Sequence, residues 1–456
     1  MTYDIAVVGG GPGGYVAAIR AAQSGKKTCL IEKGEMGGVC LNAGCIPTKV
    51  LLKSVETLKS VRMAASYGIT NLSFEKAELD MDAVQKRRKS VITQLTTGVS
   101  MLLQKKGVEV FYGTASFVEE KKLVVGEQTI EAHNIIVATG SKAIQVPLDS
   151  DSSIPIYTSN DVLQMEELPK SIVVIGGGVV GIELAYYLKH AGSQVHVVEY
   201  MDQVLPMIDH EIAGYVEMFL QELGVGLNTS AKAIGIVEKK VVVEKNGSRN
   251  EIPCNAVLMS VGRAPNTEGL NLDVPGIKTH KGAILTDAKL ETNVPGIYAV
   301  GDVNGKSMLA HTASAEAVVA VENICGIKSK MDYYKIPNAV YIQPELASVG
   351  LTEREARSKY GEVNIGRFSM ADNGKAVIDG ENQGLIKIIT EPRYGEIVGA
   401  HFFCTHATDM IGEMSLAGKL ECTASELVQT IHPHPTMSEA LHEACQATIG
   451  KAIHSL

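Results

Sequence analysis

Short apolar runs alternate with helical patterns along the first two thirds of the chain. Residues 3–22 predict a buried strand, a glycine-rich turn and a helix that presents Ala18 to a sheet, and a second strand is expected over 27–32. Residues 171–192 repeat this order, followed by a strand over 194–199. Strands that alternate with helices are typical of parallel sheets. The pattern therefore predicts an α/β protein that contains two copies of one βαβ unit.

Two further apolar strands are expected in the regions that follow these units. Residues 135–143 pass through Thr139 and Gly140, where the chain is expected to leave the first domain. Residues 291–303 end at Gly301-Asp302, where the glycine would admit a nucleotide. The aspartate is equally compatible with a helix N-cap and with a ligand for polyol hydroxyls. From about residue 332 the pattern changes to β segments and surface helices, which indicates a separate C-terminal α+β domain.

Each βαβ unit carries the spacing of a phosphate cradle. Gly9 would make the tight turn, Gly11 would admit a pyrophosphate, and Gly14 would let the helix pack closely. Glu32 would accept hydrogen bonds from ribose hydroxyls. The second unit has the same residue types at the same spacing, in Gly176, Gly178, Gly181 and Glu199. Two cradles predict two bound dinucleotides.

Two cysteines follow the first cradle. Cys40 and Cys45 are separated by four residues, and a helical pattern over 50–61 with Pro47 before it predicts a helix start just after Cys45. So short a loop gains little loop-closure entropy from a structural disulfide. A helix N-terminus favours the thiolate of Cys45. This layout is typical of a redox-active disulfide held against a bound cofactor.

The cysteine pair and the second acidic residue indicate which dinucleotides bind. A disulfide beside the first cradle favours a flavin there, which leaves a nicotinamide nucleotide for the second cradle. Glu199 would bond a 2′-hydroxyl and repel a 2′-phosphate, and no arginine lies between Gly192 and Asp209. The sequence therefore favours NAD over NADP.

Composition excludes several other classes of protein. The chain has 456 residues and a formal net charge of −9, which argues against nucleic acid or an anionic membrane as partner. The one dense basic run, Lys86–Lys89, is expected on the solvated face of a helix. No apolar run reaches the roughly 18 residues that span a bilayer, and the early first strand leaves no room for a leader, so we expect a cytoplasmic protein. The other six cysteines show no metal-ligand spacing, and no metal is expected.

A histidine-rich turn near the end of the chain is a candidate acid–base site. His434 lies between two prolines, and Glu439 follows five residues later. A carboxylate there can hold one ring nitrogen and leave the other free, although a histidine that is merely satisfied at a helix start is equally compatible with the sequence. Thr436 or Ser438 is expected to cap the helix that contains Glu439, and His432 is expected to be structural.

Taken in chain order, these motifs make the sequence resemble the pyridine nucleotide-disulfide oxidoreductases over essentially its whole length. The most specific segments are GGVCLNAGCIPTK, VGRAPN, the Gly301-Asp302 segment and HPHPTMSE. The resemblance implies two Rossmann-like domains, with the NAD-binding domain (144–264) inserted in the FAD-binding domain (1–143). It also implies a central domain that completes the FAD site (265–331) and an interface domain (332–456) that forms a homodimer.

The resemblance implies roles for the residues around the flavin. Cys40 would exchange with substrate thiols, and Cys45 would lie against the flavin as a charge-transfer thiolate. Lys49 would approach the flavin with Glu183 as its charge partner and nicotinamide-side neighbour.

Three further roles follow from the same resemblance. Asp302 would bind the ribityl chain, and Arg263 would lie near the nucleotide. His434 would be the acid–base, oriented by Glu439, and both would reach the disulfide of the partner subunit.

Within the family, the resemblance is strongest to members that reoxidise protein-bound dihydrolipoamide to lipoamide and pass the electrons through the Cys40–Cys45 disulfide and FAD to NAD⁺. It implies a lipoyl domain and acyltransferase subunit of a 2-oxoacid dehydrogenase-type complex, or the lipoyl carrier protein of glycine cleavage, as partners. Glutathione reductase would need basic residues for the NADP phosphate, and mercuric reductase would need a C-terminal cysteine pair. An assembly subunit and a diaphorase stay open as alternatives. Pro433 and Asp409 depart from the residues that are commoner in the family.

Overall fold

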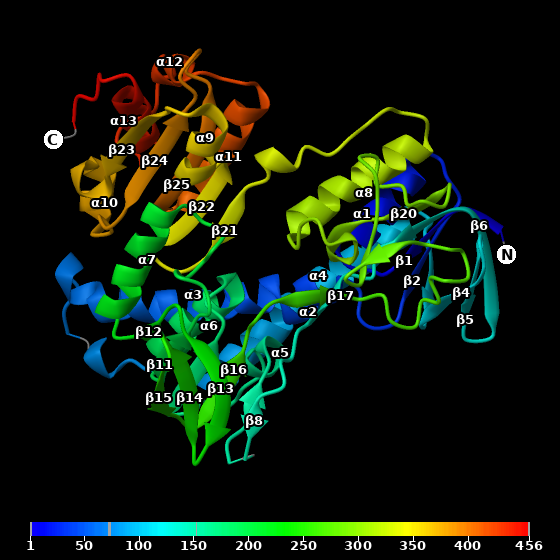
Figure 1. Ribbon diagram of the computed structural model, residues 1–456, viewed down its shortest axis with the longest axis horizontal. Helices are drawn as coiled ribbons and strands as arrows, with labels where there is room; N and C mark the ends of the chain where they lie inside the picture. The colour runs from blue at the N-terminus through cyan, green and yellow to red at the C-terminus, as the bar shows by residue number, and fades with distance from the viewer. Residues whose placement is uncertain (1, 72–73, 152, 455–456) are drawn as a thin grey trace.

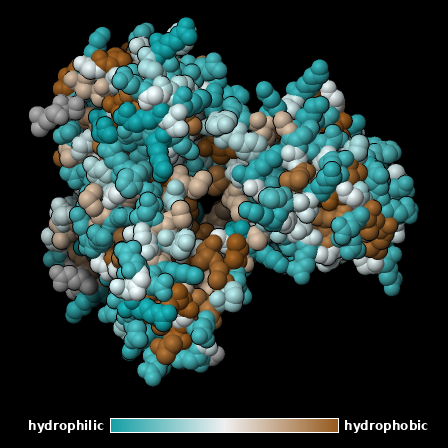
Figure 2. All heavy atoms as spheres, in the orientation of Figure 1, coloured by the Kyte–Doolittle hydropathy of each residue, from teal (hydrophilic) through white to brown (hydrophobic). Residues whose placement is uncertain are grey.

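The protein is described by a computed structural model that covers residues 2–71, 74–151 and 153–454. Its sheets form three bodies (Figure 1): the first lies on the right, the second at the lower left, and the C-terminal body at the upper left. Figure 2 shows apolar residues gathered around a hollow between the right-hand body and the other two. No helix in the described ranges is long and apolar enough to cross a membrane.

The first body is built on a seven-stranded sheet with strand order β3-β2-β1-β6-β5-β4, to which β20 adds beside β6. Its parallel part joins β1 to β2 and β6, and β20 also pairs with β6 in parallel. Helices α1 and α8 pack on this sheet, and Ala18 of α1 is fully buried as predicted. The elements are β1 (Thr2–Val8), α1 (Pro12–Gln23), β2 (Thr28–Glu32), β3 (Glu109–Tyr112), β4 (Ala115–Glu119), β5 (Lys122–Val125), β6 (Gln128–Val137), β20 (Ile297–Ala299) and α8 (Ala310–Ile324).

The second body repeats the first unit, as the sequence pattern predicts. Its parallel sheet has the order β12-β11-β10-β16-β9, and an antiparallel β13-β14-β15 meander with β8 covers it. The elements are β8 (Asp149–Ser150), β9 (Ile156–Tyr157), α5 (Ser159–Val162), β10 (Ser171–Ile175), α6 (Val179–His190), β11 (Gln194–Val198), α7 (His210–Glu222), β12 (Gly226–Asn228), β13 (Lys232–Val237), β14 (Lys240–Lys245), β15 (Ser248–Pro253) and β16 (Ala256–Met259). A two-stranded pair of β7 (Ser141–Ala143) and β17 (Arg263–Pro265) connects this body to the first.

The C-terminal body is an antiparallel sheet with helices on it, which confirms the predicted change of pattern. Its strand order is β21-β22-β25-β24-β23. The elements are β21 (Asn338–Val340), β22 (Glu345–Gly350), α9 (Glu353–Tyr360), β23 (Asn364–Ser369), α10 (Gly374–Asp379), β24 (Leu385–Thr390), β25 (Ile397–Cys404), α11 (Ala407–Lys419), α12 (Ala424–Val428) and α13 (Glu439–Thr448). A small hairpin of β18 (Thr279–His280) and β19 (Ala283–Ile284) lies earlier in the chain.

Three helices that follow the first cradle run across the middle of the molecule: α2 (Gly38–Ala43), α3 (Cys45–Met63) and α4 (Met81–Lys105). Leu51 and Val55 of α3 share one buried core with Tyr187 of α6 and Phe403 of β25. Helix α3 is therefore fixed by side chains of both the second and the C-terminal bodies.

The basic run on α4 is only partly solvated. Lys86, Arg87 and Lys89 are exposed, as predicted, but Arg88 is buried and its Nε donates to Gln85 Oε1 at 2.6 Å. The prediction is wrong for Arg88 because α4 turns one side of this run inward against the rest of the protein.

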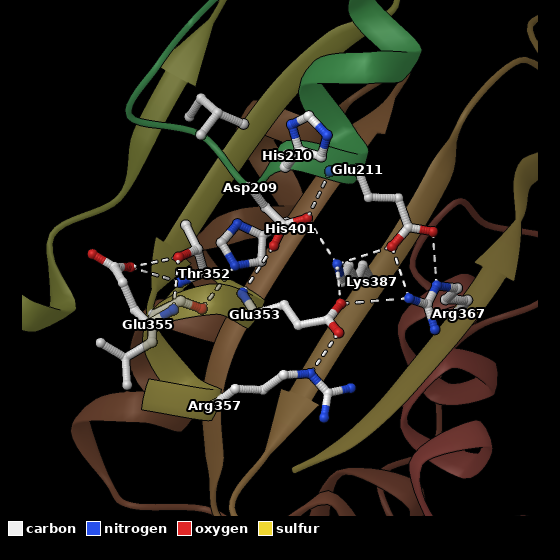
Figure 3. A network of polar contacts seen from close by, with 12 residues as sticks. Asp209, His210, Glu211, Thr352, Glu353, Glu355, Arg357, Arg367, Lys387 and His401 are labelled. Atoms are coloured by element: carbon white, nitrogen blue, oxygen red, sulfur yellow. Dashed lines mark hydrogen bonds and ion pairs between the residues drawn. The ribbon is translucent and has the colours of Figure 1, made fainter. Parts of the chain in front are cut away.

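A buried charge network joins the second body to the C-terminal body (Figure 3). Lys387 of β24 is 1% exposed, and its Nζ lies 2.8–2.9 Å from carboxylate oxygens of Asp209, Glu211 and Glu353. Arg367 of β23 holds Glu211 through two nitrogens, at 2.7 and 2.9 Å. The residues of this interdomain charge network come from the start of α7 in the second body and from β23, β24 and α9 in the C-terminal body. The network therefore fixes how the two bodies meet.

Candidate disulfide and dinucleotide site

The two predicted cysteines lie at adjoining helix ends. Cys40 is in α2 and Cys45 is the first residue of α3, with Gly44 between the helices. Both are half-buried free thiols, and their side chains hydrogen bond to each other. This hydrogen bond raises the pKa of Cys40. The same hydrogen bond and the Lys49 ammonium together lower the pKa of Cys45 to about 7, against the effect of burial. Cys45 is therefore the better thiolate of the pair.

Lys49 and Glu183 meet one helical turn beyond Cys45. The Lys49 Nζ lies 2.9 Å from both carboxylate oxygens of Glu183, whose side chain is 3% exposed. The Tyr341 N–H donates to Glu183 Oε1 at 2.9 Å, and the Lys49 Nζ lies 4.4 Å from the centre of the Tyr341 ring. Helix α3, helix α6 and the segment after β21 thus contribute one residue each. The structure brings the predicted Lys49–Glu183 pair together, and Tyr341 is an addition that sequence reasoning missed.

The first cradle has room for a ligand where the sequence requires it. A Cβ added at Gly14 would lie 1.7 Å from the carbonyl oxygen of Gly9, so only glycine lets α1 approach this turn. A Cβ at Gly11 would meet nothing nearer than 3.9 Å, so the space in front of this residue is open. Glu32, at the end of β2, accepts from the N–H groups of Gly10 at 2.5 Å and Gly34 at 2.7 Å. The open cradle at the N-terminus of α1, with a carboxylate beside it, fits a dinucleotide.

The second cradle repeats this geometry. A Cβ at Gly181 would lie 2.0 Å from the carbonyl oxygen of Gly176, whereas a Cβ at Gly178 would meet nothing within 4 Å. Glu199 follows β11 directly and accepts from the N–H groups of Gly177 at 2.6 Å and Met201 at 2.7 Å. This cradle fits a second dinucleotide, and its acidic residue occupies the position expected for NAD.

Asp302 and Arg263 meet on a common partner, Ser141. The Ser141 Oγ donates to Asp302 Oδ2 at 2.5 Å and accepts from the Nε of Arg263 at 2.7 Å. Asp302 lies within the short 3-10 turn η3 (Gly301–Asn304), whose N-cap position is Val300. Of the two interpretations left open by the sequence, the N-cap is therefore wrong, because Asp302 lies inside the turn and bonds a side chain from β7.

Thr139 and Gly140 lie where the chain leaves β6. The Thr139 Oγ1 donates to the carbonyl of Asn266 at 2.7 Å, and the Asn266 N–H donates to the carbonyl of Gly140 at 2.9 Å. These bonds continue the pairing of β7 with β17 and hold the outgoing and returning chain segments side by side.

The C-terminal histidine turn has the predicted pairing. His434 Nδ1 lies 2.9 Å from Glu439 Oε1, and Glu439 Oε2 accepts from the Thr436 N–H at 2.8 Å. Burial opposes the charge of Glu439, but these two partners outweigh it and lower its pKa. The His434 side chain is 80% exposed, so its Nε2 edge is open for a reacting group.

The predicted hydroxyl cap of α13 is wrong. Ser438 is at the N-cap position but makes no side-chain capping bond, and the Thr436 Oγ1 donates to the carbonyl of Pro433 at 2.8 Å. The Thr436 hydroxyl therefore bonds within the turn and does not cap the helix. The carboxylate of Glu439 accepts the hydrogen bond from the Thr436 N–H. The His432 side chain is 7% exposed, and its Nε2 lies 3.0 Å from Glu413 Oε1, which agrees with a structural residue.

Two dinucleotide cradles around one dithiol define a class of protein, the disulfide oxidoreductases that move electrons between thiols and dinucleotides. A family model described as "Pyridine nucleotide-disulphide oxidoreductase" matches residues 3–317, and the model for its dimerisation domain matches residues 336–445. The chain belongs to this family. It is a flavin disulfide oxidoreductase with FAD and NAD as cofactors, and its dimerisation domain supports the predicted homodimer.

Individual relatives span the whole chain. One, a dihydrolipoyl dehydrogenase from Bacillus subtilis (strain 168), is 40% identical over 99% of this chain and 100% of its own. A dihydrolipoyl dehydrogenase from Thermus scotoductus is 41% identical over 100% of this chain and 99% of its own. The solved structure of the HOCl-induced flavoprotein disulfide reductase RclA from Escherichia coli has a TM-score of 0.86 and 26% identity, and covers 97% of this chain and 99% of that one.

Within the described residues, no group of three or more His, Cys, Asp or Glu side chains could hold a metal ion.

Proposed function

We propose that this enzyme reoxidises protein-bound dihydrolipoamide to lipoamide and reduces NAD⁺. The carrying observation is the Cys40–Cys45 pair, whose sulfurs share a hydrogen bond at the start of α3 and whose second member has a pKa lowered to about 7. Relatives that are about 40% identical over the whole chain and are named dihydrolipoyl dehydrogenase support this substrate.

The cysteines would perform thiol–disulfide exchange. In the oxidised enzyme, a substrate thiolate would attack the sulfur of Cys40, and the sulfur of Cys45 would leave as a thiolate. The second substrate thiol would then displace Cys40, which forms the lipoamide disulfide and leaves both cysteines reduced. The lowered pKa of Cys45 suits this division because a more acidic thiol is the better leaving group.

His434 would accept the proton of the attacking thiol at Nε2, because Glu439 engages Nδ1. In Figure 1, α13 lies far from α2 within one chain. We therefore propose that the His434–Glu439 pair of one subunit serves the cysteine pair of the other in the homodimer.

The remaining residues would hold the two cofactors. FAD, when bound, supplies the path by which the electron pair of the dithiol reaches NAD⁺. Lys49, fixed by Glu183, would place its positive charge beside the cysteine pair and the flavin. We propose these residues for FAD: Gly9, Gly11, Gly14, Glu32, Lys49, Thr139, Gly140, Arg263, Gly301 and Asp302. We propose these for NAD: Gly176, Gly178, Gly181, Glu183 and Glu199.

The domain ranges and the partners complete the proposal. We propose an FAD-binding domain over 1–143, an NAD-binding domain over 144–264, a central domain over 265–331 and an interface domain over 332–456. The substrate would be presented in the cytoplasm by a lipoyl domain of a 2-oxoacid dehydrogenase-type complex with its acyltransferase, or by the lipoyl carrier protein of glycine cleavage.

The decisive experiment is reduction of NAD⁺ by free dihydrolipoamide with the purified, FAD-loaded enzyme. We expect turnover in the wild type and none in Cys45→Ser, while reduction of a dye by NADH survives in that variant because it bypasses the disulfide. Absence of turnover above background in the loaded wild type would refute the proposed substrate. Equal dihydrolipoamide activity in Cys45→Ser would refute the role of the cysteine pair.

A further inference from the structure

A buried carboxylate on α8 contacts the turn that carries Asp302. Glu316 is 0% exposed. Its Oε2 accepts from the Gly301 N–H at 2.5 Å and from the Asn304 Nδ2 at 2.9 Å, which are the first and last residues of η3. Its Oε1 accepts from the Tyr333 hydroxyl at 2.5 Å. One carboxylate thus binds both ends of the turn and a tyrosine from the start of the C-terminal region.

Glu316 is not the sole support of the turn, because Val303 is fully buried and the Asn304 Nδ2 also donates to the carbonyl of Ala299 at 3.4 Å. Gly301 has a φ of +75°, a conformation that glycine adopts readily, and the turn is only four residues long. Its own backbone contributes the bond from the Gly305 N–H to the carbonyl of Asp302 at 3.1 Å. Loss of the Glu316 carboxylate would deprive the buried Gly301 N–H of the acceptor that it has in the wild type.

A carboxylate at this position is costly. Burial raises the pKa of Glu316, and the hydrogen bonds from Tyr333, Gly301 and Asn304 oppose that rise. No lysine or arginine forms an ion pair with Glu316 among the described residues. Helix α8 is otherwise lined by small residues such as Ala313 and Ala317, so packing alone would accept an apolar side chain here. An apolar replacement would lose the hydrogen bonds that the carboxylate accepts from these three donors.

We propose that Glu316 is a positioning residue for the flavin site: it fixes the Gly301–Asn304 turn so that the carboxylate of Asp302 stays beside Ser141 and Arg263, in place for the ribityl hydroxyls. This inference rests on the proposed role of Asp302 as a flavin ligand. Glu316 itself, fully buried, acts through Asp302.

The test measures affinity for FAD and not turnover. Apoprotein of each variant is titrated with FAD, and binding is followed by the quenching of flavin fluorescence. For Glu316→Gln we expect the Kd for FAD to rise about tenfold, because an amide cannot accept from all three donors. Tyr333→Phe removes one of the three donors and leaves the turn's own bonds intact, so it should raise the Kd by a smaller factor, about threefold. Should Glu316→Gln fail to fold, Tyr333→Phe still tests the proposal, because an unchanged Kd in that variant would overturn it.

A matched control separates positioning from general destabilisation. Glu391 is another buried glutamate whose carboxylate accepts from three turn N–H groups, those of Arg393, Tyr394 and Glu396, but it lies in the C-terminal body. Glu391→Gln should lower the thermal midpoint and leave the Kd for FAD unchanged. An unchanged Kd in Glu316→Gln, with a loss of thermal stability like that of Glu391→Gln, would overturn the proposal.

A double-mutant cycle distinguishes this inference from the proposed function. If Glu316 acts through Asp302, the Glu316→Gln/Asp302→Asn double variant binds FAD no more weakly than Asp302→Asn alone. Additive losses would overturn the inference and leave the ligand role of Asp302 intact. An unchanged Kd in Asp302→Asn would instead refute that ligand role, and the inference would fall with it.

Discussion

Replacement of Lys387 by methionine is expected to destabilise the folded protein more than loss of any surface ion pair. The side chain is 1% exposed and forms ion pairs with three carboxylates, at 2.8 to 2.9 Å (Figure 3). Methionine keeps much of the volume and removes the charge. The change therefore tests whether the interdomain charge network holds the second body against the C-terminal body.

The magnitude follows from which carboxylate is left without a cation. Arg367 still pairs with Glu211 at 2.7 Å, and Arg357 still pairs with Glu353 at 2.8 Å. Asp209 is 2% exposed, and within the described part of the chain no arginine bridges it. A buried charge that loses its partner costs about 3–5 kcal/mol of unfolding free energy. The double variant Lys387→Met/Asp209→Asn removes that charge as well and should recover most of this loss.

The pH dependence has a definite sign. Burial opposes the charge of Asp209, but the His401 ring, the Lys387 ammonium and the Glu353 N–H outweigh it and lower its pKa in the wild type. That stabilisation is present above the unfolded pKa of about 3.9 and is lost as the pH falls through the lower folded value. Loss of Lys387 removes one of these lowering partners, so the folded pKa of Asp209 is expected to be higher in the variant than in the wild type. The deficit of the variant should thus be largest near pH 7 and shrink as the pH falls toward 4.

The assay is urea unfolding followed by circular dichroism, at fixed concentrations of protein and FAD because both shift the apparent stability. The control is Lys86→Met, which breaks a pair on α4 with both side chains more than 70% exposed and should change the stability far less than Lys387→Met does. If Lys387→Met costs no more than this control, or if its deficit grows toward acid pH, the reasoning about buried charge is wrong.

Two further predictions concern the reacting groups. Lys49→Met should raise the pKa of Cys45 above its value of about 7, because the Lys49 ammonium lowers that pKa, whereas Lys49→Arg should keep it low. Thiolate absorbance measured against pH in the reduced enzyme gives the pKa in both variants. An unchanged pKa in Lys49→Met would contradict the electrostatic account. His434→Ala should lower kcat for dihydrolipoamide about 100-fold or more, because it removes the imidazole that accepts the proton. Glu439→Gln should lower kcat less, because the imidazole remains. Steady-state rates that fall more in Glu439→Gln than in His434→Ala would exclude the assigned roles.

Features that depend on short sequence spacing could be predicted from the sequence. The two cradles are set by glycines within six residues of one another and by a carboxylate at the end of the next strand, and they have that geometry. Pro47 and the helical pattern after it predicted a helix start just after Cys45, and α3 begins at Cys45 itself. The Lys49–Glu183 pair spans 134 positions of sequence and was expected only through the family resemblance.

Features that depend on chain segments meeting in space could not be predicted in this way. Lys387 lies in the strand LIKIIT, whose residues are all buried, and the pattern of that strand says nothing of partners on α7 and α9. Arg88 lies in a run of four basic residues, yet only its position on the helix decides that it is buried. Ser141 follows Thr139-Gly140 directly, so its place was visible, but its bridge between Asp302 and Arg263 appears only in the fold.

The contacts that converge on α3 join the dithiol to the second cradle. Gly178 precedes the first turn of α6, and Glu183 lies on the same helix one turn further on. Glu183 holds the Lys49 ammonium, and that ammonium lowers the pKa of Cys45. A shift of α6 relative to α3 would therefore change the charge beside Cys45 without touching either sulfur. Because the N–H of Tyr341 holds the same carboxylate from the C-terminal body, all three bodies determine how readily this thiolate forms.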